Sequence, residues 1–309
     1  MSFFSFSRKP DEKPAEFGKV LSAEERGVLD LGIIAGSGRY PVLLAEAARK
    51  AGVKRIVVAA FKDETDPVME ELADICMWMR VGQLGRMISF FGQCGAKGAI
   101  MAGQIAPSNL FNLRPDMKAL LLLAKLKERN AESIFGAIGA EMSKAGTELL
   151  PATSFLEDAM PGPGLVAGPA LPRRSKMDIQ YGYRIAKEVS RLDIGQSVVV
   201  KKGTVLAVEA FEGTDATIAR GGQQSRGEGA VLVKVSKPKQ DMRFDVPVIG
   251  PRTMESARAS GISVVACEAN RTLLLDKAEI SRLAVLHKIT VYAAGEEMLA
   301  EDAAAPGGA

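Results

Sequence analysis

The chain is poor in the residues that most catalytic and metal sites use. Among its 309 residues there is a single histidine, His287, and the three cysteines, Cys76, Cys94 and Cys267, form no CxxC pair. One histidine excludes histidine-rich zinc sites and leaves any Ser–His–Asp triad dependent on that residue alone. An odd number of scattered cysteines is a poor disulfide framework and is typical of a reduced, cytoplasmic protein.

Concentrated charge and long hydrophobic runs are also missing. The formal net charge is only +3, and aromatic residues make up 6% of the chain. Nucleic-acid binders usually concentrate basic charge, so no nucleic acid is expected as a partner. The longest apolar run, LLLLA at 120–124, is far shorter than the ~20 residues that span a bilayer. A cytoplasmic protein without a membrane-spanning segment is therefore predicted.

What the sequence does contain is a regular alternation of apolar strands and helices. Residues 1–27 are charged, include Pro10 and Pro14, and are predicted to form a disordered arm. Over 28–163, runs such as LGIIAG, KRIVVAAF and KGAIMAG alternate with helical segments. Continuous apolar strands that alternate with helices specify a parallel sheet covered on both faces. The fold class predicted for this part is α/β, with a Rossmann-like N-terminal domain.

A second domain of different type follows a stretch rich in proline and glycine. PGPGLVAGPALP, at 161–172, predicts a linker. Over 164–298 the pattern predicts a distinct α/β domain with a mixed sheet, because KKG lies between two alternating apolar runs and is typical of a hairpin. The last residues, 299–309, have the composition of a disordered tail.

LGIIAGSGRYP places a glycine turn between the first strand and the first helix. Such a turn lets backbone N–H groups approach a phosphate at a helix N-terminus. The third glycine of GxGxxG is missing, and Pro41 stands in its place. Three interpretations stay open: a dinucleotide site with Asp63 or Glu64 at the ribose, a phosphate contact, or a simple tight turn. The candidate ligands are Gly36, Ser37 and Gly38.

MAGQIAPSNL, at 101–110, places small and amide side chains after another parallel strand. The carboxyl ends of parallel strands are where such sheets bind ligands. Gln104, Ser108 and Asn109 are therefore candidates for polar recognition. The alternative is a loop that caps the following helix.

AVEAFEGTDATIARGG, at 207–222, ends an apolar strand in acidic and hydroxyl residues. Glu212, Thr214 and Asp215 surround Gly213, and Glu209 lies just before them. Carboxylate oxygens at a strand end can ligate a hard cation such as Mg²⁺. Thr214 or Asp215 could equally cap the helix that follows.

KVSKPKQDMRFDVP, at 234–247, carries charges at every second residue. In an extended chain they would share one face, since residues i and i+2 point the same way. Such a face could hold a metal and a phosphate, or it could be a solvated sheet edge. The nearby EGTD cluster favours the site. The five charged residues are Lys237, Lys239, Asp241, Arg243 and Asp245.

Three stretches closely resemble the LpxI family: LGIIAGSGRYP, LDIGQSVVVKKGTVLAVEAFEGTDATI and LVKVSKPKQDMRFDVPVIGPRTME. The likeness covers about residues 28–295, in order. It implies a UDP-2,3-diacylglucosamine diphosphatase of lipid A biosynthesis that depends on Mg²⁺ and releases UMP and 2,3-diacylglucosamine 1-phosphate (lipid X). It further implies that the lipid product is held between the two domains. The family's catalytic aspartate is carried to Asp241, with Asp245 as its nearest competitor.

Together the residues and the resemblance predict one site between the domains. Lys237 and Arg243 would neutralise phosphate oxygens, and the glycine turn, Gln104, Thr214 and Gln240 would bind substrate. The lipid-linked UDP-sugar implies peripheral contact with the inner-leaflet membrane surface, and a homodimer is a possible assembly. A nucleotide-dependent oxidoreductase that uses the GSG turn and a non-catalytic anion-binding module are the alternatives. The predicted Mg²⁺ ligands and catalytic acids are Asp241, Asp215 and Asp245, with Glu212 as a further metal ligand.

Overall fold

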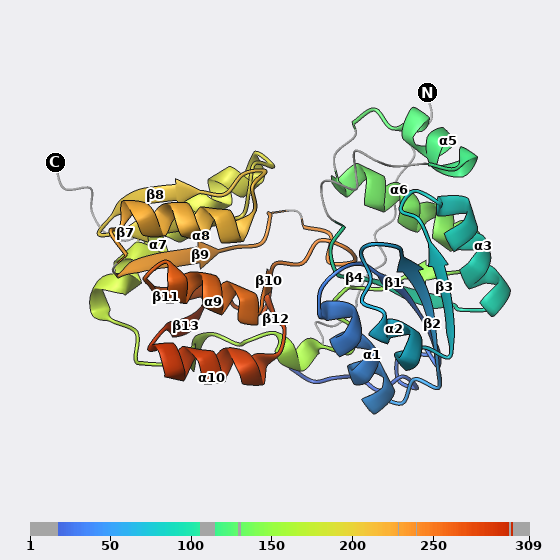
Figure 1. Ribbon diagram of the computed structural model, residues 1–309, viewed down its shortest axis with the longest axis horizontal. Coiled ribbons are helices and arrows are strands. Elements are labelled where there is room, and N and C mark those ends of the chain that lie inside the picture. Colours follow the sequence, from blue (N-terminus) through green and yellow to red (C-terminus); the bar gives the residue numbers. More distant parts are fainter. Residues whose placement is uncertain are drawn as a thin grey trace, which may run out of the picture.

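The computed structural model describes residues 18–105, 115–128, 131–227, 229–238, 240–296 and 298. Two α/β lobes lie side by side, and each is built on its own sheet (Figure 1). The lobe that contains the first sheet is called the N-terminal domain, and the other the C-terminal domain. Among the described residues, no helix is both long enough and apolar enough to cross a membrane.

The N-terminal domain has a five-stranded, all-parallel sheet in the order β3-β2-β1-β4-β5. Its strands are β1 (Asp30–Ala35), β2 (Arg55–Phe61), β3 (Ile75–Met79), β4 (Gly98–Ala102) and β5 (Glu148–Leu149). The helices that belong to it are α1 (Tyr40–Lys50), α2 (Val68–Leu72), α3 (Leu84–Cys94), α5 (Met117–Lys125) and α6 (Ala131–Lys144). The predicted Rossmann-like arrangement is confirmed.

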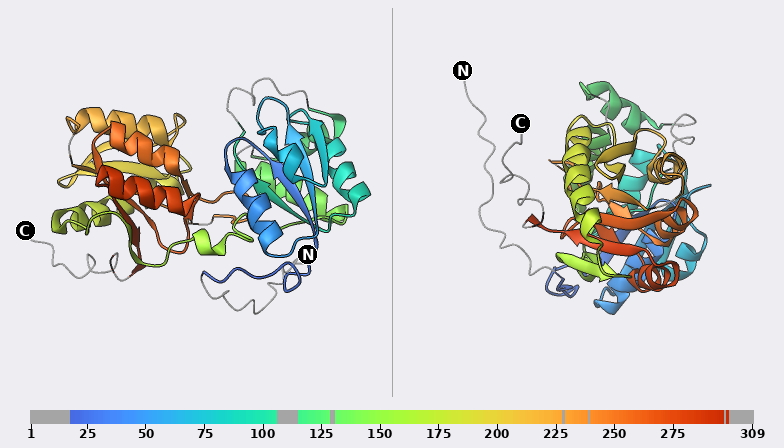
Figure 2. Two further views of the ribbon diagram at one scale, coloured as in Figure 1. Left: turned by 60° about the horizontal axis from the view of Figure 1, so that its bottom comes forward. Right: turned by 90° about the vertical axis from the view of Figure 1, so that its left-hand side faces the viewer.

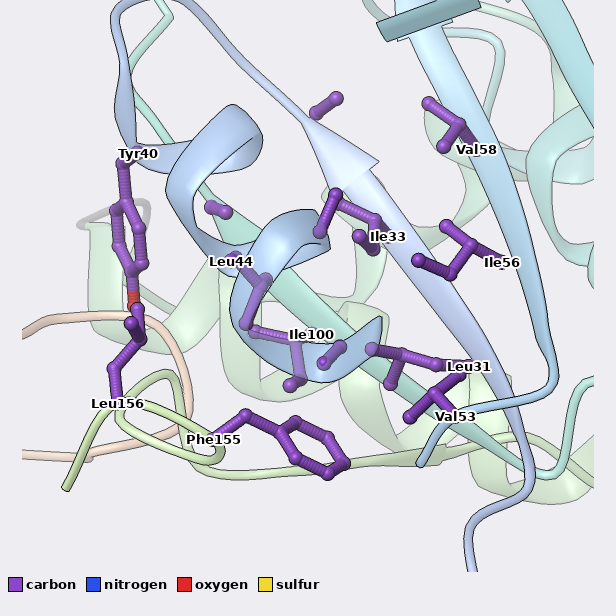
Figure 3. Close-up of a cluster of buried hydrophobic side chains, with 14 of the residues drawn as sticks. Leu31, Ile33, Tyr40, Leu44, Val53, Ile56, Val58, Ile100, Phe155 and Leu156 are labelled. Carbon is purple, nitrogen blue, oxygen red and sulfur yellow. The ribbon is translucent and has the colours of Figure 1, made fainter. Parts of the chain in front are cut away.

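Alternate residues of the apolar strands explain why both faces of this sheet are covered. Leu31 and Ile33 of β1 pack with Leu44 of α1 in one buried cluster (Figure 3). Ile34, one residue further along the strand, points the other way and packs with Phe91 of α3. Because side chains of a strand alternate between faces, a continuous apolar strand requires helices on both sides.

The C-terminal domain has a six-stranded mixed sheet in the order β6-β13-β11-β9-β7-β8. Strands β9, β11 and β13 are mutually parallel. The pairs β6–β13, β7–β9 and β7–β8 are antiparallel. The strands are β6 (Gly164–Ala167), β7 (Ser197–Lys201), β8 (Thr204–Val208), β9 (Ala230–Lys234), β11 (Ile262–Glu268) and β13 (Thr290–Ala294). The helices are α7 (Arg173–Arg191), α8 (Thr214–Gln224), α9 (Pro251–Ala259) and α10 (Lys277–His287). A mixed sheet was predicted, and the hairpin at KKG is present.

Two segment predictions need correction. The stretch 161–172 is not only a linker, because it contains β6, an edge strand in which Leu165 lies opposite Tyr292 of β13. The predicted arm reaches too far: Ala23 is buried, and its N–H donates to the carbonyl of Ala51 at 2.8 Å. Burial against the end of α1 outweighs the polar composition of this segment. Residues 1–17 and 299–309 lie outside the described residues.

Segments of the C-terminal part of the chain cross to the N-terminal domain. Two short strands, β10 (Val248–Ile249) and β12 (Leu273–Leu274), pair in parallel at the junction. Leu273 belongs to the same buried cluster as β1 and α1. Figure 2 shows the connecting segments between the two domains. The chain that leaves β9, at 235–247, is one of these crossings, and it carries Asp241.

Candidate active site

The two polar motifs of the N-terminal domain meet at the carboxyl edge of its sheet. Ser37, after β1, and Gln104, after β4, form an isolated antiparallel bridge in which Ser37 N donates to Gln104 O at 2.7 Å. The Ser37 hydroxyl donates to the same carbonyl at 2.9 Å. The structure therefore brings together the glycine turn and the Gln104 loop, which the sequence predicted separately. Ser108 and Asn109 lie outside the described residues.

This bridge gives the glycine turn a structural reason of its own. A Cβ at Gly36 would lie 2.5 Å from Gln104 O, so no side chain fits there. Gly38 has a φ of 87°, which favours glycine. Strands β1 and β4 flank the point where the strand order reverses, which is where such sheets place dinucleotides. Because a backbone bridge spans that point, the geometry is less favourable to a dinucleotide than the GSG motif suggests.

The C-terminal domain contributes a buried polar cluster at the end of β9. Lys234 donates through Nζ to Thr214 Oγ1 at 3.1 Å, and Thr214 in turn donates to Glu209 Oε1 at 2.9 Å. Lys234 and Glu209 are each only 7% exposed. The second carboxylate oxygen of Glu209 has no hydrogen-bond partner among the described residues. A buried ammonium with few hydrogen bonds is costly unless another group binds it.

Three acidic side chains act on the charge of buried Lys234. Burial lowers its pKa, while the negative charges of Glu209, Asp215 and Asp245 act in the opposite direction. Asp215 and Asp245 were predicted to share a site, and both lie within electrostatic range of this one ammonium. The lysine therefore links the EGTD cluster with the end of the 234–247 segment.

Asp215 is held by side chains of α9 rather than by its own helix. Its Oδ1 accepts from Ser256 Oγ at 3.0 Å, and its Oδ2 lies 2.8 Å from Nε of Arg252. The N-cap of α8 is Gly213, and no side-chain cap is found among the described residues. The alternative role of Thr214 or Asp215 as a cap is therefore not what the structure shows.

The predicted extended conformation of 237–245 is wrong. The segment is irregular and contains a turn, in which the N–H groups of Phe244 and Asp245 donate to the carbonyl of Asp241 at 3.3 and 3.1 Å. The cause is the crossing to the other domain: Ala152 N donates to Met242 O at 2.7 Å, and the ring of Phe244 lies 5.5 Å from that of Phe135. The charges consequently do not share one face. Lys239 lies outside the described residues.

Asp241 is paired with Arg243 at the surface of the N-terminal domain. Arg243 Nε donates to Asp241 Oδ1 at 3.0 Å and Nη2 donates to Oδ2 at 2.6 Å. These hydrogen bonds hold the pKa of Asp241 below its ordinary value, against the opposing effect of burial. The guanidinium reaches α6, where a Cβ at Gly139 would lie 3.7 Å from Nη1. Asp241 thus stays ionised at the boundary between the domains.

The remaining predicted residues fall into two places. Lys237 precedes Asp241 by four residues, and its Nζ lies 2.5 Å from Asp193 Oδ1 and 3.4 Å from Asp245 Oδ2. Burial opposes ionisation of Lys237, but these two carboxylates raise its pKa. Gln240 accepts from Lys237 N at 2.6 Å through its side-chain oxygen. Glu212 is instead bound by Arg220, on α8.

Comparison with known proteins identifies the family. The family model of the LpxI N-terminal domain matches residues 30–159, and the family model of the LpxI C-terminal domain matches residues 162–292. A Caulobacter vibrioides protein named UDP-2,3-diacylglucosamine pyrophosphatase LpxI is 33% identical over 261 residues, which are 80% of this chain and 91% of that relative. The chain belongs to the LpxI family.

In this LpxI family member the four predicted metal ligands do not form a ready-made site. Each carboxylate already has a cationic partner: Asp241 with Arg243, Asp215 with Arg252, Asp245 with Lys237, and Glu212 with Arg220. The described residues contain no group of three histidine, cysteine or acidic side chains placed to hold a metal ion. Mg²⁺ is commonly bound by one or two carboxylates together with substrate phosphates. Asp241, Asp215 and Asp245 supply carboxylates of the type that this mode uses.

Sequence reasoning missed Lys234, although a signal for it exists. In GAVLVKV, Val231 and Val233 face α7, whereas Leu232 points to the other side of the sheet. By strand alternation Lys234 shares the side of Leu232, which is also buried. A lysine on a buried side of a strand needs an acidic partner or a ligand.

A second network that the sequence did not predict fixes the start of the Asp241 segment. Glu268 Oε2, at the end of β11, accepts from Ser236 N at 2.8 Å and from Ser236 Oγ at 2.7 Å. Lys187 of α7 lies 2.7 Å from the same oxygen and donates to Ser236 O at 2.8 Å. Ser236 is fully buried. The segment that carries Asp241 therefore leaves the C-terminal domain from a fixed point.

Proposed function

We propose that the protein hydrolyses the diphosphate of UDP-2,3-diacylglucosamine to UMP and 2,3-diacylglucosamine 1-phosphate. Its family and the name of its relative make it a hydrolase that acts on a diphosphate bond. The observation that supports the site is the position of Asp241, an ionised carboxylate on a segment that crosses from the C-terminal to the N-terminal domain. Arg243 of the same segment pairs with it, and Lys237 of that segment pairs with Asp245.

The charges around Asp241 suit a reaction that develops negative charge on phosphate oxygens. Arg243 presents a planar fork, which binds phosphate as well as carboxylate. A diphosphate that binds Arg243 would replace Asp241 as its anionic partner. The freed carboxylate of Asp241 would then orient or deprotonate the attacking water. Lys237 would neutralise oxygens of the same group. Preorganised charges of this kind typically supply several kcal/mol of transition-state stabilisation.

The N-terminal domain would contribute binding rather than chemistry. The turn at Gly36–Gly38 leads into α1, a helix of 11 residues whose first N–H groups face the carboxyl edge of the sheet. Such N–H groups favour an anion. We assign the turn and the Gln104 loop to substrate binding.

We further propose Mg²⁺ as the cofactor, with Asp241 as its protein ligand and Asp245 or Asp215 as a second one. The metal would neutralise the diphosphate and polarise its P–O bonds. Because the substrate is lipid-linked, we expect the protein to work at the inner-leaflet membrane surface. The homodimer stays a prediction.

Asp241→Asn tests the assignment. It keeps the shape of the side chain but removes the charge, and we expect UMP release to fall by about 10³-fold because a positioned base or metal ligand is lost. The matched control is Asp30→Asn, since Asp30 also pairs with an arginine, Arg55, but at the opposite edge of the sheet. The control should keep its activity.

UMP release is measured with detergent-solubilised substrate, with Mg²⁺ and with EDTA, on protein whose thermal unfolding is unchanged. Near-wild-type turnover of Asp241→Asn would show that Asp241 is not catalytic. Full activity in EDTA would remove Mg²⁺ from the mechanism and leave the hydrolase assignment standing.

A further inference from the structure

Helix α5 has an apolar face on each side, and one of them is exposed. Ala119 and Leu122 are buried in the core of the N-terminal domain. On the opposite side Met117, Leu120 and Leu121 are 70%, 48% and 55% exposed. Together with exposed Ala124 they follow the spacing i, i+3, i+4, i+7, so they line up along the helix. These four residues are called the α5 stripe.

The start of α5, where the α5 stripe begins, is tied to the start of α3. Asp116 accepts from Ala119 N at 2.9 Å, which caps α5, and from Gly85 N at 2.7 Å, at the start of α3. Helix α3 begins after the carboxyl end of β3, so α5 starts at the same sheet edge as the Ser37–Gln104 bridge. In Figure 1, α5 lies on the outside of the N-terminal domain, away from the C-terminal domain. The stripe is thus a fixed surface and not a fraying end.

Basic residues lie along one border of the α5 stripe. Lys118 and Lys125 are seven residues apart and therefore share a side of the helix, and exposed Lys127 follows. Exposed Arg86 of α3 follows Gly85, at which a Cβ would lie 3.3 Å from Cβ of Lys118. The neighbouring acids are Glu141, which pairs with Lys118 at 3.4 Å, and exposed Glu128. The border is basic on balance and complements an anionic surface.

The size and shape of the stripe favour a lipid surface over a second copy of the chain. Nine residues of helix extend about 13 Å. One face of such a helix is much smaller than the ~800 Å² per partner of a standard protein interface. Apolar residues on one face and lysines at its border are the usual features of a helix that lies in the headgroup region of a bilayer. The lysine stems can reach anionic headgroups while their apolar carbons stay in contact with the stripe.

We propose that the α5 stripe docks the protein on a bilayer that contains anionic lipids. Docking holds the carboxyl edge of the N-terminal sheet next to the membrane surface. The purpose of this contact rests on the proposed function, since a lipid-linked substrate would be taken up from that surface. The binding itself does not depend on catalysis and is tested without substrate.

The test is co-sedimentation of the full chain with vesicles of phosphatidylcholine, with and without phosphatidylglycerol. The variant Met117→Gln/Leu120→Gln/Leu121→Gln removes the apolar contacts from exposed positions, so the fold should be retained. We expect its vesicle partition coefficient to fall by about tenfold or more, since three large apolar side chains can no longer be buried in the bilayer. The control is Val285→Gln/Leu286→Gln on α10, where the two side chains are 68% and 60% exposed.

Equal vesicle binding by the stripe variant and the wild type would overturn the proposal, and so would absence of wild-type binding to the anionic vesicles. If the wild type is dimeric by light scattering and the stripe variant is monomeric, the stripe is instead a contact between copies. UMP release from detergent-solubilised substrate separates this proposal from the proposed function: the stripe variant should keep it. If the wild type releases no UMP there, the proposed function fails while the vesicle result still decides the role of the stripe.

Discussion

The carboxyl edges of the two sheets carry different kinds of chemical group. In the N-terminal domain the edge consists of backbone and small or neutral side chains, at Gly36–Gly38 and Gln104, joined by a backbone bridge. In the C-terminal domain the corresponding edge carries buried or half-buried charges, with Lys234 and Glu268 at strand ends. Backbone N–H groups can position an anion without being titrated, whereas paired charges can stabilise a developing charge. Under the proposed function, this difference assigns binding to the N-terminal edge and stabilisation of charge to the C-terminal edge.

The largest effect should come from breaking the charged network that anchors the Asp241 segment. Glu268→Ala leaves Lys187 and the fully buried Ser236 without their shared acceptor. We expect the free energy of unfolding to fall by about 3 kcal/mol, because removal of one partner leaves a buried charge unpaired. Chemical denaturation measures it. Glu279→Ala, in an exposed pair with Arg282, should change nothing, and an equal loss there would mean that burial is not the cause.

Lys234→Met removes the central cation of the C-terminal edge but keeps its apolar volume. If the ammonium stabilises phosphate charge, turnover should fall by about 100-fold. UMP release by the folded variant is the measurement. Lys201→Met is the control, since Lys201 also donates a hydrogen bond, to the carbonyl of Ser225, but lies at the opposite end of β7 from Ser197, which pairs with Lys234. An unchanged turnover in Lys234→Met would make the lysine purely structural.

A single added methyl group should disrupt the backbone bridge at the carboxyl edge of the N-terminal sheet. Gly36→Ala would place a Cβ 2.5 Å from Gln104 O, and overpacking of this kind costs about 2 kcal/mol of stability. The affinity for substrate should fall more than the turnover if this edge only binds. The control is Gly136→Ala, in the middle of α6, where a Cβ meets nothing within 4 Å. It should stabilise the protein by about 0.5–1 kcal/mol.

The smallest expected effect is on how the free energy of unfolding depends on pH. Burial would raise the pKa of Glu268, but hydrogen bonds from Lys187 and Ser236 outweigh it and lower that pKa from its ordinary value of 4.5. A lowered folded-state pKa stabilises the fold above the unfolded value, and this stability is lost as the pH falls through the folded value. Urea denaturation should therefore show a steeper loss below about pH 4.5 in the wild type than in Glu268→Gln. Parallel curves would assign the acid sensitivity to other carboxylates.

Much of the fold was predictable because its signals are local. The strand and helix succession of the N-terminal domain follows from apolar periodicity, and the KKG hairpin follows from turn chemistry. The segment 237–245 failed for a non-local reason: alternating charges indicate a strand, but the contacts of Phe244 and Met242 with the other domain bend the chain. Strand β6 was missed because an edge strand needs a partner, and its partner β13 lies more than 100 residues away.

The sequence by itself determined the two α/β domains, the family resemblance and the residue types available for chemistry: carboxylates, lysines and arginines, with one histidine. Only the tertiary structure decided which of them meet. It pairs Asp241 with Arg243 at the boundary of the domains, brings Asp215 and Asp245 within electrostatic range of buried Lys234, and leaves Glu212 with Arg220 on α8. The reason is physical: periodicity reports which face of an element is buried, whereas the partners of a buried charge come from elements far apart in the chain.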